Sequence, residues 1–201
     1  METLDLDKVV EEILSQIRES LNKVDKEQIE KFIDMLVNAR GKKILVSGAG
    51  RTGLVARAFA MRLMHLGYLV YVVGETITPS LEKDDILIAI SGSGTTTLVV
   101  EAAKAAKIVG SKVIAITSFP ESPLVQLADH TIILPGRTKT SSKTDYFSRQ
   151  ILGFHEPLLP LGTLFETNCL IFLDIIIVEL MKELNITEEE LKKRHANIEG
   201  L

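Results

Sequence analysis

The sequence contains a single cysteine, Cys169, and no tryptophan. One thiol cannot form a disulfide framework or a cysteine zinc site, so both are excluded. Basic residues are not in excess: 23 Lys and Arg stand against 27 Asp and Glu, the net charge is −4, and there is no basic tail or stripe. Because binding to a phosphate backbone needs concentrated Lys and Arg, nucleic acid is not an expected partner.

A targeting segment and a long uninterrupted hydrophobic run are also missing. The N-terminus, METLDLDKVVEEI, is acidic and amphipathic and resembles neither a signal nor a transit peptide, so we expect a cytoplasmic protein. The most apolar segment, residues 169–181, is interrupted by Asp174 and Glu179. It is shorter than the roughly 20 apolar residues that span a bilayer, so it predicts a buried or interface helix and no membrane partner.

What the sequence does contain is a regular alternation of short apolar runs and helical segments. Two amphipathic helices, at 5–22 and 26–39, are followed by five β-branched runs that predict buried strands: KKILVSG, YLVYVVGE, DDILIAISGSG, KVIAITS and HTIILPG. Helices are expected between most of them, at about 53–66, 96–109 and 122–128, but the crossover TITPSLEKDD lacks a helical signal. The pattern predicts an α/β fold with a doubly wound five-stranded parallel sheet flanked by helices, a flavodoxin-like three-layer αβα sandwich.

The length and the 46% hydrophobic content predict one domain over residues 1–201 with a substantial core. A helical pair at about 5–39 and C-terminal helices at about 163–195 are added to the sheet at its two ends. Between them, the connector at 136–160 is polar and contains proline. Loops of this length are usually functional or mobile.

The segment ISGSGTTT places five hydroxyls and two glycines between the third strand and the next helix. Glycine lets the backbone approach a ligand, and a helix start offers unpaired N–H groups to which hydroxyls add donors. Ser91, Gly92, Ser93, Gly94 and Thr96 therefore predict a cradle for an anion, most simply a phosphate. The alternative is a purely structural turn, since Ser and Thr are common N-caps.

A second glycine-rich turn, SGAGRTG, follows the first strand, and Gly48, Gly50 and Gly53 satisfy the dinucleotide pattern G-x-G-x-x-G. Glu75, at the end of the second strand, lies where a ribose-binding acid is expected, so a dinucleotide site is a real alternative. A dinucleotide fold needs only one such turn, however. Two turns on neighbouring strand ends can instead form two walls of one small pocket at the carboxyl edge of the sheet.

Five segments together carry a family resemblance: SGAGRTG, FAMRLMHLG, VGETITPS, ISGSGTT and RHANIE. In these the chain resembles the sugar isomerase (SIS) domain family over nearly its whole length. The resemblance implies a single SIS domain that interconverts D-arabino-3-hexulose 6-phosphate and fructose 6-phosphate, a step of the ribulose monophosphate pathway, without a cofactor. It also implies a homo-oligomer, a tetramer in which neighbouring subunits complete the active sites.

The resemblance also implies roles for individual residues. Ser91, Ser93 and Thr96 would bind the phosphate, Ser47 would line the pocket, and Glu166 would be the catalytic base. From the residues alone, Glu166 in the segment PLGTLFETN starts an apolar helix, where a carboxylate can also do no more than complement the helix dipole. As a base, it would need burial that brings its pKa toward working pH.

Three further side chains are candidates for the chemistry. Arg51 or His65 could face the negative oxygen of an enediolate, and His195, near the end of the chain, could reach across a subunit boundary. His65 could equally be a buried histidine on an apolar helix, and His195 an exposed one. The 3-hexulose cannot close a five-membered ring because O6 carries the phosphate, whereas fructose 6-phosphate closes through O5. Loss of a ring-opening histidine should therefore impair the reverse direction more.

Other functions stay open at this level. A regulatory module could bind a sugar phosphate without converting it, although the N-terminal helices lack a basic recognition pattern. Arabinose 5-phosphate isomerase shares the implied fold but usually carries an added regulatory domain, for which this chain offers no segment. No metal is indicated, because the four histidines show no HxH or HxxxH spacing.

Overall fold

The computed structural model describes residues 5–136 and 163–195. The chain begins with two helices, α1 (Leu6–Leu21) and α2 (Lys26–Val37), as predicted. Each starts at an aspartate whose carboxylate accepts hydrogen bonds from backbone amides of the first turn: Asp5 from Lys8, and Asp25 from Glu27. These caps satisfy amides that have no partner within the helix.

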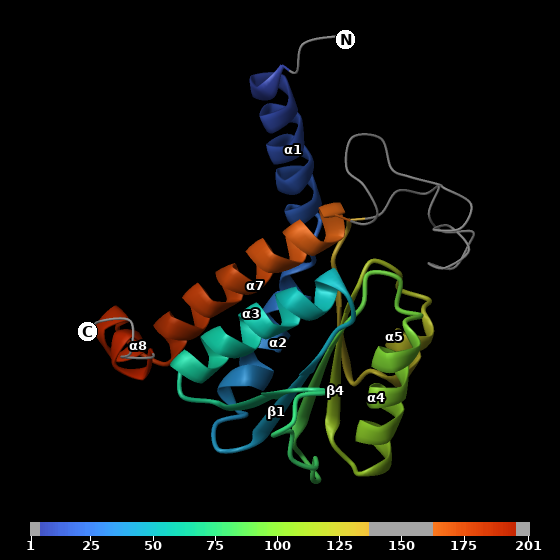
Figure 1. The fold of residues 1–201 in the computed structure, drawn as a ribbon, viewed down its shortest axis with the longest axis vertical. Helices are drawn as coiled ribbons and strands as arrows, with labels where there is room; N and C mark the ends of the chain where they lie inside the picture. The colour runs from blue at the N-terminus through green and yellow to red at the C-terminus, as the bar shows by residue number, and fades with distance from the viewer. Residues whose placement is uncertain (1–4, 137–162, 196–201) are drawn as a thin grey trace.

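A five-stranded sheet forms the centre of the molecule (Figure 1). Its strands are β1 (Lys43–Ser47), β2 (Leu69–Val72), β3 (Ile86–Ile90), β4 (Lys112–Thr117) and β5 (His130–Ile133), in the order β2-β1-β3-β4-β5. Every neighbouring pair is parallel. Helices α3 (Arg51–His65), α4 (Thr97–Ile108) and α5 (Pro123–Leu127) connect strands, and the crossover from β2 to β3 has no helix. The doubly wound parallel sheet is therefore confirmed.

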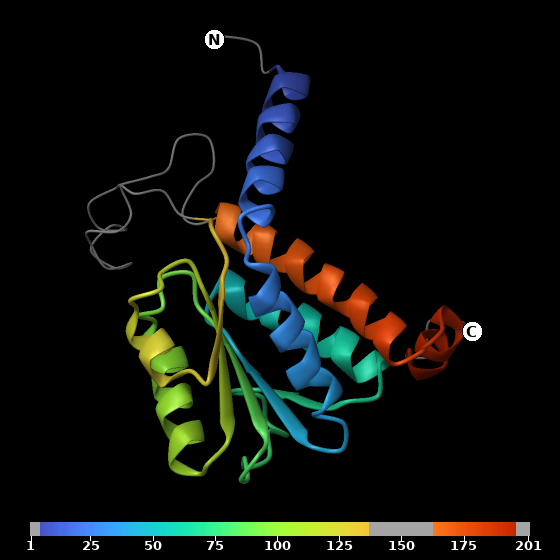
Figure 2. The ribbon, with the colours of Figure 1, turned by 180° about the vertical axis from the view of Figure 1, so that it is seen from behind.

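Helices cover both faces of the sheet, because successive strand residues point to opposite sides. Ile44, Val46 and Ile88 belong to the core beneath α2, α3 and the C-terminal helix α7 (Thr163–Glu183), whereas Leu45 and Leu87 belong to the core beneath α4 and α5. Figure 2 shows α4 and α5 on one side of the sheet and α2, α3 and α7 on the other. Strands buried on both faces explain the continuous apolar runs in the sequence.

The C-terminal helices also match the prediction. α7 packs beside α3 and buries Phe165, Cys169 and Phe172. α8 (Glu188–Arg194) starts with a capping box in which Thr187 and Glu190 hydrogen-bond to each other's backbone amides. Among the described helices none is long and apolar enough to cross a membrane. The predicted connector at 136–160 lies, except for Gly136, outside the described residues.

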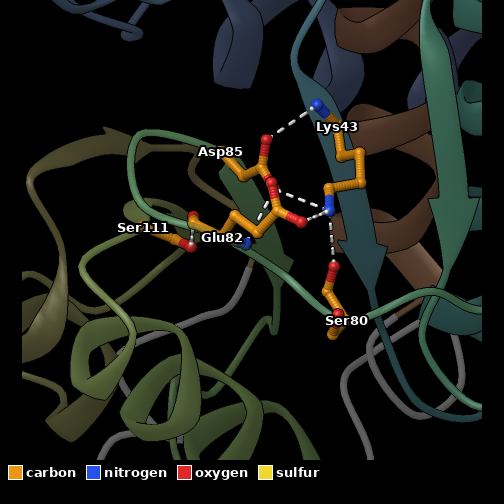
Figure 3. Close-up of polar contacts among 5 residues, drawn as sticks. All are labelled: Lys43, Ser80, Glu82, Asp85 and Ser111. Atoms are coloured by element: carbon orange, nitrogen blue, oxygen red, sulfur yellow. Dashed lines mark hydrogen bonds and ion pairs between the residues drawn. The ribbon is translucent and has the colours of Figure 1, made fainter.

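The amino edge of the sheet is closed by a charged network (Figure 3). Asp85, before β3, is buried and accepts hydrogen bonds from the backbone amides of Lys43 (2.9 Å) and Glu82 (2.8 Å). The ammonium of Lys43 lies 3.1 Å from the Glu82 carboxylate and donates to the Ser80 carbonyl (2.8 Å), and Ser111 donates to the Glu82 carbonyl. The hydrogen bond with Glu82 raises the pKa of Lys43. This network ties the helix-free crossover to the sheet.

Candidate active site

The strand order places a switch point between β1 and β3. The chain leaves β1 into α3 on one face and leaves β3 into α4 on the other, while β1 and β3 lie side by side, with Ser47 paired to Ala89. Open α/β sheets bind ligands in the crevice at such a point, outside the carboxyl ends of the strands. Both glycine-rich segments lie there: the β1 turn (residues 47–53) and the β3 turn (residues 91–96).

Tight packing shapes the β1 turn. A side chain at Gly48 would place its Cβ 2.8 Å from the Thr52 carbonyl oxygen, and Gly50 adopts φ +58° where it caps α3. Ser47 is fully buried, and among the described residues its hydroxyl has no hydrogen-bond partner. A buried polar atom without a partner costs stability and calls for an explanation. Ser47 lies at the carboxyl end of β1, where the β1 turn begins.

The hydroxyls of the β3 turn hydrogen-bond within the turn itself. The Ser91 hydroxyl lies 2.8 Å from that of Thr96 and accepts from the Gly94 amide (3.1 Å), and Thr95 donates to the Ser93 hydroxyl (3.0 Å). Thr96 is the N-cap of α4, but its side chain makes no capping hydrogen bond. The first amides of α4 are therefore left without a side-chain cap in a preorganised turn, which is the arrangement that binds anions.

The loop after β4 supports the β3 turn from behind. The Leu124 amide donates to the Gly94 carbonyl (3.1 Å), and the Ser118 amide donates to the Gly92 carbonyl (3.2 Å). Gly94 adopts φ +64°, and a Cβ there would collide with the side chain of Ser122. The Ser122 hydroxyl is buried and has no partner in the described segments. The turn is thus held in one conformation by packing as well as by its own hydrogen bonds.

Glu166 and Arg51 meet beside these turns. Glu166 lies in the first turn of α7, and Arg51 is the first residue of α3; the Arg51 Nε donates to the Glu166 carboxylate. The Glu166 side chain is only 14% exposed, whereas that of Arg51 is 64% exposed. Burial raises the pKa of Glu166 and outweighs the opposing effect of Arg51. A carboxylate of this kind is suited to taking up and returning a proton.

The structure brings His65 and His195 together but away from Glu166. Their rings lie 5.0 Å apart, and Arg194 donates to the His65 carbonyl (3.1 Å), holding the end of α8 against α3. His65 is buried, and burial, followed by the charges of His195 and Arg62, lowers its pKa. Arg51 and His65 are the first and last of the 15 residues of α3, about 21 Å apart along the axis.

Glu75, the acid of the dinucleotide alternative, is paired with Arg57. The Arg57 Nε donates to the Glu75 carboxylate at 2.9 Å, and both side chains line a hollow of about 250 Å³ between α3 and β2. The strand order is of the flavodoxin type, not the order 3-2-1-4-5-6 of dinucleotide-binding folds. In the described parts of the chain, no three His, Cys, Asp or Glu residues lie close enough together to hold a metal ion.

Comparison with known proteins gives consistent matches. Residues 35–151 match the sequence model of the SIS domain. The chain is 46% identical over 173 residues to the 3-hexulose-6-phosphate isomerase of Methanocaldococcus jannaschii, covering 86% of this chain and 85% of the relative. It is 36% identical over 190 residues to the 3-hexulose-6-phosphate isomerase of Bacillus subtilis, covering 94% of this chain and 97% of the relative.

A solved structure agrees with these sequence matches. A Methanococcus jannaschii protein, for which its crystal structure infers the function of 3-hexulose-6-phosphate isomerase, superposes on this chain with a TM-score of 0.74. The two share 43% sequence identity, and the alignment covers 96% of this chain and 98% of the other. The likeness therefore extends over nearly the whole chain.

Proposed function

The chain belongs to the SIS domain family, and we propose that it is an isomerase that interconverts D-arabino-3-hexulose 6-phosphate and fructose 6-phosphate. The observation that carries this proposal is the contact between Arg51 and the partly buried Glu166 beside two glycine turns at the switch point. The turns offer an anion site, and the carboxylate offers a base. The names of the relatives supply the substrate.

The β3 turn would hold the 6-phosphate. Amides at the start of α4 and the hydroxyls of Ser91, Ser93 and Thr96 would donate to its oxygens, and glycine at 92 and 94 lets the phosphate approach the backbone. The hydrogen bonds now made among these hydroxyls would be exchanged for bonds to phosphate. The Ser47 hydroxyl and the backbone of the β1 turn would form the opposite wall.

Glu166 would move the proton between the two carbons. It removes the proton from C2 of the 3-hexulose while O3 gains a proton, which gives a cis-enediol. Return of the carbon-bound proton to C3, with loss of the O2 proton, leaves the carbonyl at C2. The proton lost from O2 balances the one gained by O3, so the reaction consumes no cofactor. The raised pKa of Glu166 supports both steps, because it is more basic than an exposed glutamate.

Arg51 would stabilise the negative oxygen that develops at O2 and O3. Its Nε holds Glu166, and because the side chain is largely exposed, its other N–H groups are available to the substrate. A positive charge fixed next to a developing enediolate lowers the barrier without reorganisation. The same contact would orient Glu166, so Arg51 serves the base and the intermediate together.

We further propose that the active enzyme is a homotetramer with shared sites. The N-terminal part of α1 projects from the body of the molecule (Figure 1), and Leu6, Val10 and Leu14 on it are exposed. Exposed apolar surface of this kind marks interfaces. Since His65 and His195 lie far from the Arg51 of their own chain, a catalytic role for this pair requires the site of a neighbouring subunit.

The test is a coupled assay in which the 3-hexulose 6-phosphate is supplied and fructose 6-phosphate is measured. Glu166→Gln should lower kcat by about 10²–10⁴-fold, the range for loss of a general base. Glu179→Gln is the matched control, since it also removes a carboxylate of α7 from a pair with a basic residue, Lys182, but lies 13 residues, about 20 Å along the axis, from Glu166. It should leave kcat unchanged.

Three outcomes would overturn parts of the proposal. Full activity in Glu166→Gln would keep the reaction but require another base. A wild-type protein that fails to convert the substrate, yet unfolds at a higher temperature in its presence, would favour a sugar-phosphate-binding regulatory module. Conversion of arabinose 5-phosphate instead would change the substrate but not the roles of the residues.

A further inference from the structure

Asn168 is a buried polar residue whose presence stability alone does not explain. It lies two residues after Glu166 in α7 and is fully buried. Its Nδ2 donates to the Pro135 carbonyl at 2.8 Å, but its Oδ1 has no partner within residues 5–136 and 163–195. An orphaned amide oxygen in a core costs more than an apolar side chain of the same shape. We therefore look for a role of the hydrogen bond to the Pro135 carbonyl other than lowering the free energy of the folded state.

Pro135 belongs to a segment that is fixed on the sheet. The preceding residue, Leu134, donates from its amide to the Thr117 carbonyl (2.9 Å), and its own carbonyl accepts from the Ser118 hydroxyl (2.9 Å). The following residue, Gly136, packs directly on the backbone of Phe165, so closely that a Cβ at Gly136 would lie 2.8 Å from the Phe165 amide nitrogen. The first turn of α7 thus docks on a rigid support by one hydrogen bond and one backbone contact.

The two side chains emerge from opposite sides of the helix. Residues 166 and 168 are separated by about 200° around the axis, so Asn168 faces the sheet segment while Glu166 faces α3. A rotation of about 20° would move a side-chain tip at about 6 Å radius by roughly 2 Å. Misplacement of a catalytic group by 1 Å can cost about 100-fold in rate. The anchor at Asn168 controls this rotation.

We propose that Asn168 is a positioning residue, which sets the rotation of α7 through the Pro135 carbonyl so that Glu166 meets Arg51 and the substrate carbon. The inference rests on the proposed role of Glu166 as base. Asn168 itself does not touch the substrate. In the part of the chain that the structure describes, the groups that face Glu166 are Arg51 from α3 and the buried Cys169 from its own helix.

The test compares Asn168→Leu with Tyr68→Phe. Tyr68 is also buried and donates one hydrogen bond to a backbone carbonyl, that of Leu36 at 3.0 Å, beyond the end of α3 that is opposite to Arg51 and Glu166. Asn168→Leu should lower kcat at least tenfold with KM unchanged, and the acid limb of the kcat/KM profile should move to lower pH as Glu166 becomes hydrated. Tyr68→Phe should change the melting temperature only. Inorganic phosphate, added as a probe of the β3 turn, should bind wild type and both variants equally.

A second variant and a second measurement test the positioning role of Asn168 independently of the proposed isomerase reaction. Gly136→Ala should displace the same helix turn at the neighbouring contact with Phe165 and give the same loss of kcat, which covers the case in which Asn168→Leu does not fold. The carboxyl NMR titration of Glu166, assigned with Glu166→Gln, needs no turnover. An unchanged Glu166 titration and kcat in both variants would overturn the positioning role even in an active enzyme. A lowered pKa in both would support it even if the true substrate is another sugar phosphate.

Discussion

Replacement of Gly94 by alanine tests whether the β3 turn is held by packing from behind. Two separate penalties are expected. An L side chain at φ +64° is strained, at a cost of about 1–2 kcal/mol. The new Cβ also collides with Ser122, and inserting a methyl group into a packed site costs about 1–3 kcal/mol. Together they give a loss of about 2–5 kcal/mol, which for a chain of this size lowers the melting temperature by roughly 4–20 °C.

Ser122→Gly separates the cost of the steric collision from the cost of the positive φ angle. It removes the side chain that collides with the new Cβ, and it costs little alone, because the Ser122 hydroxyl has no hydrogen-bond partner and makes no helix cap. The double variant Gly94→Ala/Ser122→Gly should therefore recover about 1–3 kcal/mol and keep the loss of about 1–2 kcal/mol that comes from φ. Wild type, the two single variants and the double variant form a double-mutant cycle. In this cycle the double variant should be more stable than the sum of the two single losses predicts.

The assay is equilibrium unfolding of the four proteins, with and without phosphate. Gly94→Ala should also lose most of the stabilisation by phosphate, because the strained turn no longer presents its amides in one arrangement. A coupling energy near zero would refute the packing argument, since it would mean that Ser122 does not hold the turn. Phosphate stabilisation that survives in Gly94→Ala would show that the turn is not the anion site.

Two other predictions follow from the histidines. If His65 or His195 opens the sugar ring, His65→Ala or His195→Ala should slow conversion of fructose 6-phosphate more than the opposite direction; equal losses in both directions, measured in coupled assays, would exclude that role. Burial lowers the pKa of His130, whose Nε2 donates to the Gln28 carbonyl at 2.8 Å. The unfolded chain then binds more protons, so stability should fall as pH drops below about 6.5, and His130→Leu should flatten this slope in melting curves at pH 5–8. An equal slope in both proteins would contradict the assignment.

Most of the fold could be predicted because its signals are local. Strands such as Ile86–Ile90 are buried on both faces and therefore apolar at every position, and caps such as Thr187 with Glu190 mark a helix start within four residues. The start of α3 was less clear. It begins at Arg51 and not at about 53, because its cap is Gly50, a residue that is common in turns of every kind. The family was also predicted correctly, from short motifs spread along the chain.

The candidate site was predictable only in part. Ser91 to Thr96 could be recognised because the residues of a turn are adjacent in sequence. The contact between Arg51 and Glu166 joins residues 115 positions apart, and only the family resemblance had suggested the role of Glu166. Asn168 was missed, because its partner is a backbone carbonyl 33 residues away, which leaves no pattern in the sequence. The one signal in the sequence was an asparagine on a helix face that is otherwise apolar.

The charged network at the amino edge has a consequence for protein engineering. Lys43, Glu82 and Asp85 are paired with one another and with backbone groups, whereas Ser47, at the opposite end of β1, keeps a hydroxyl that has no partner among the described residues. The charged pairs thus lie at one end of the strand and the proposed site at the other. Redesign of the charged pairs should therefore change heat tolerance, for example to suit an industrial reactor, without changing the residues of the proposed site.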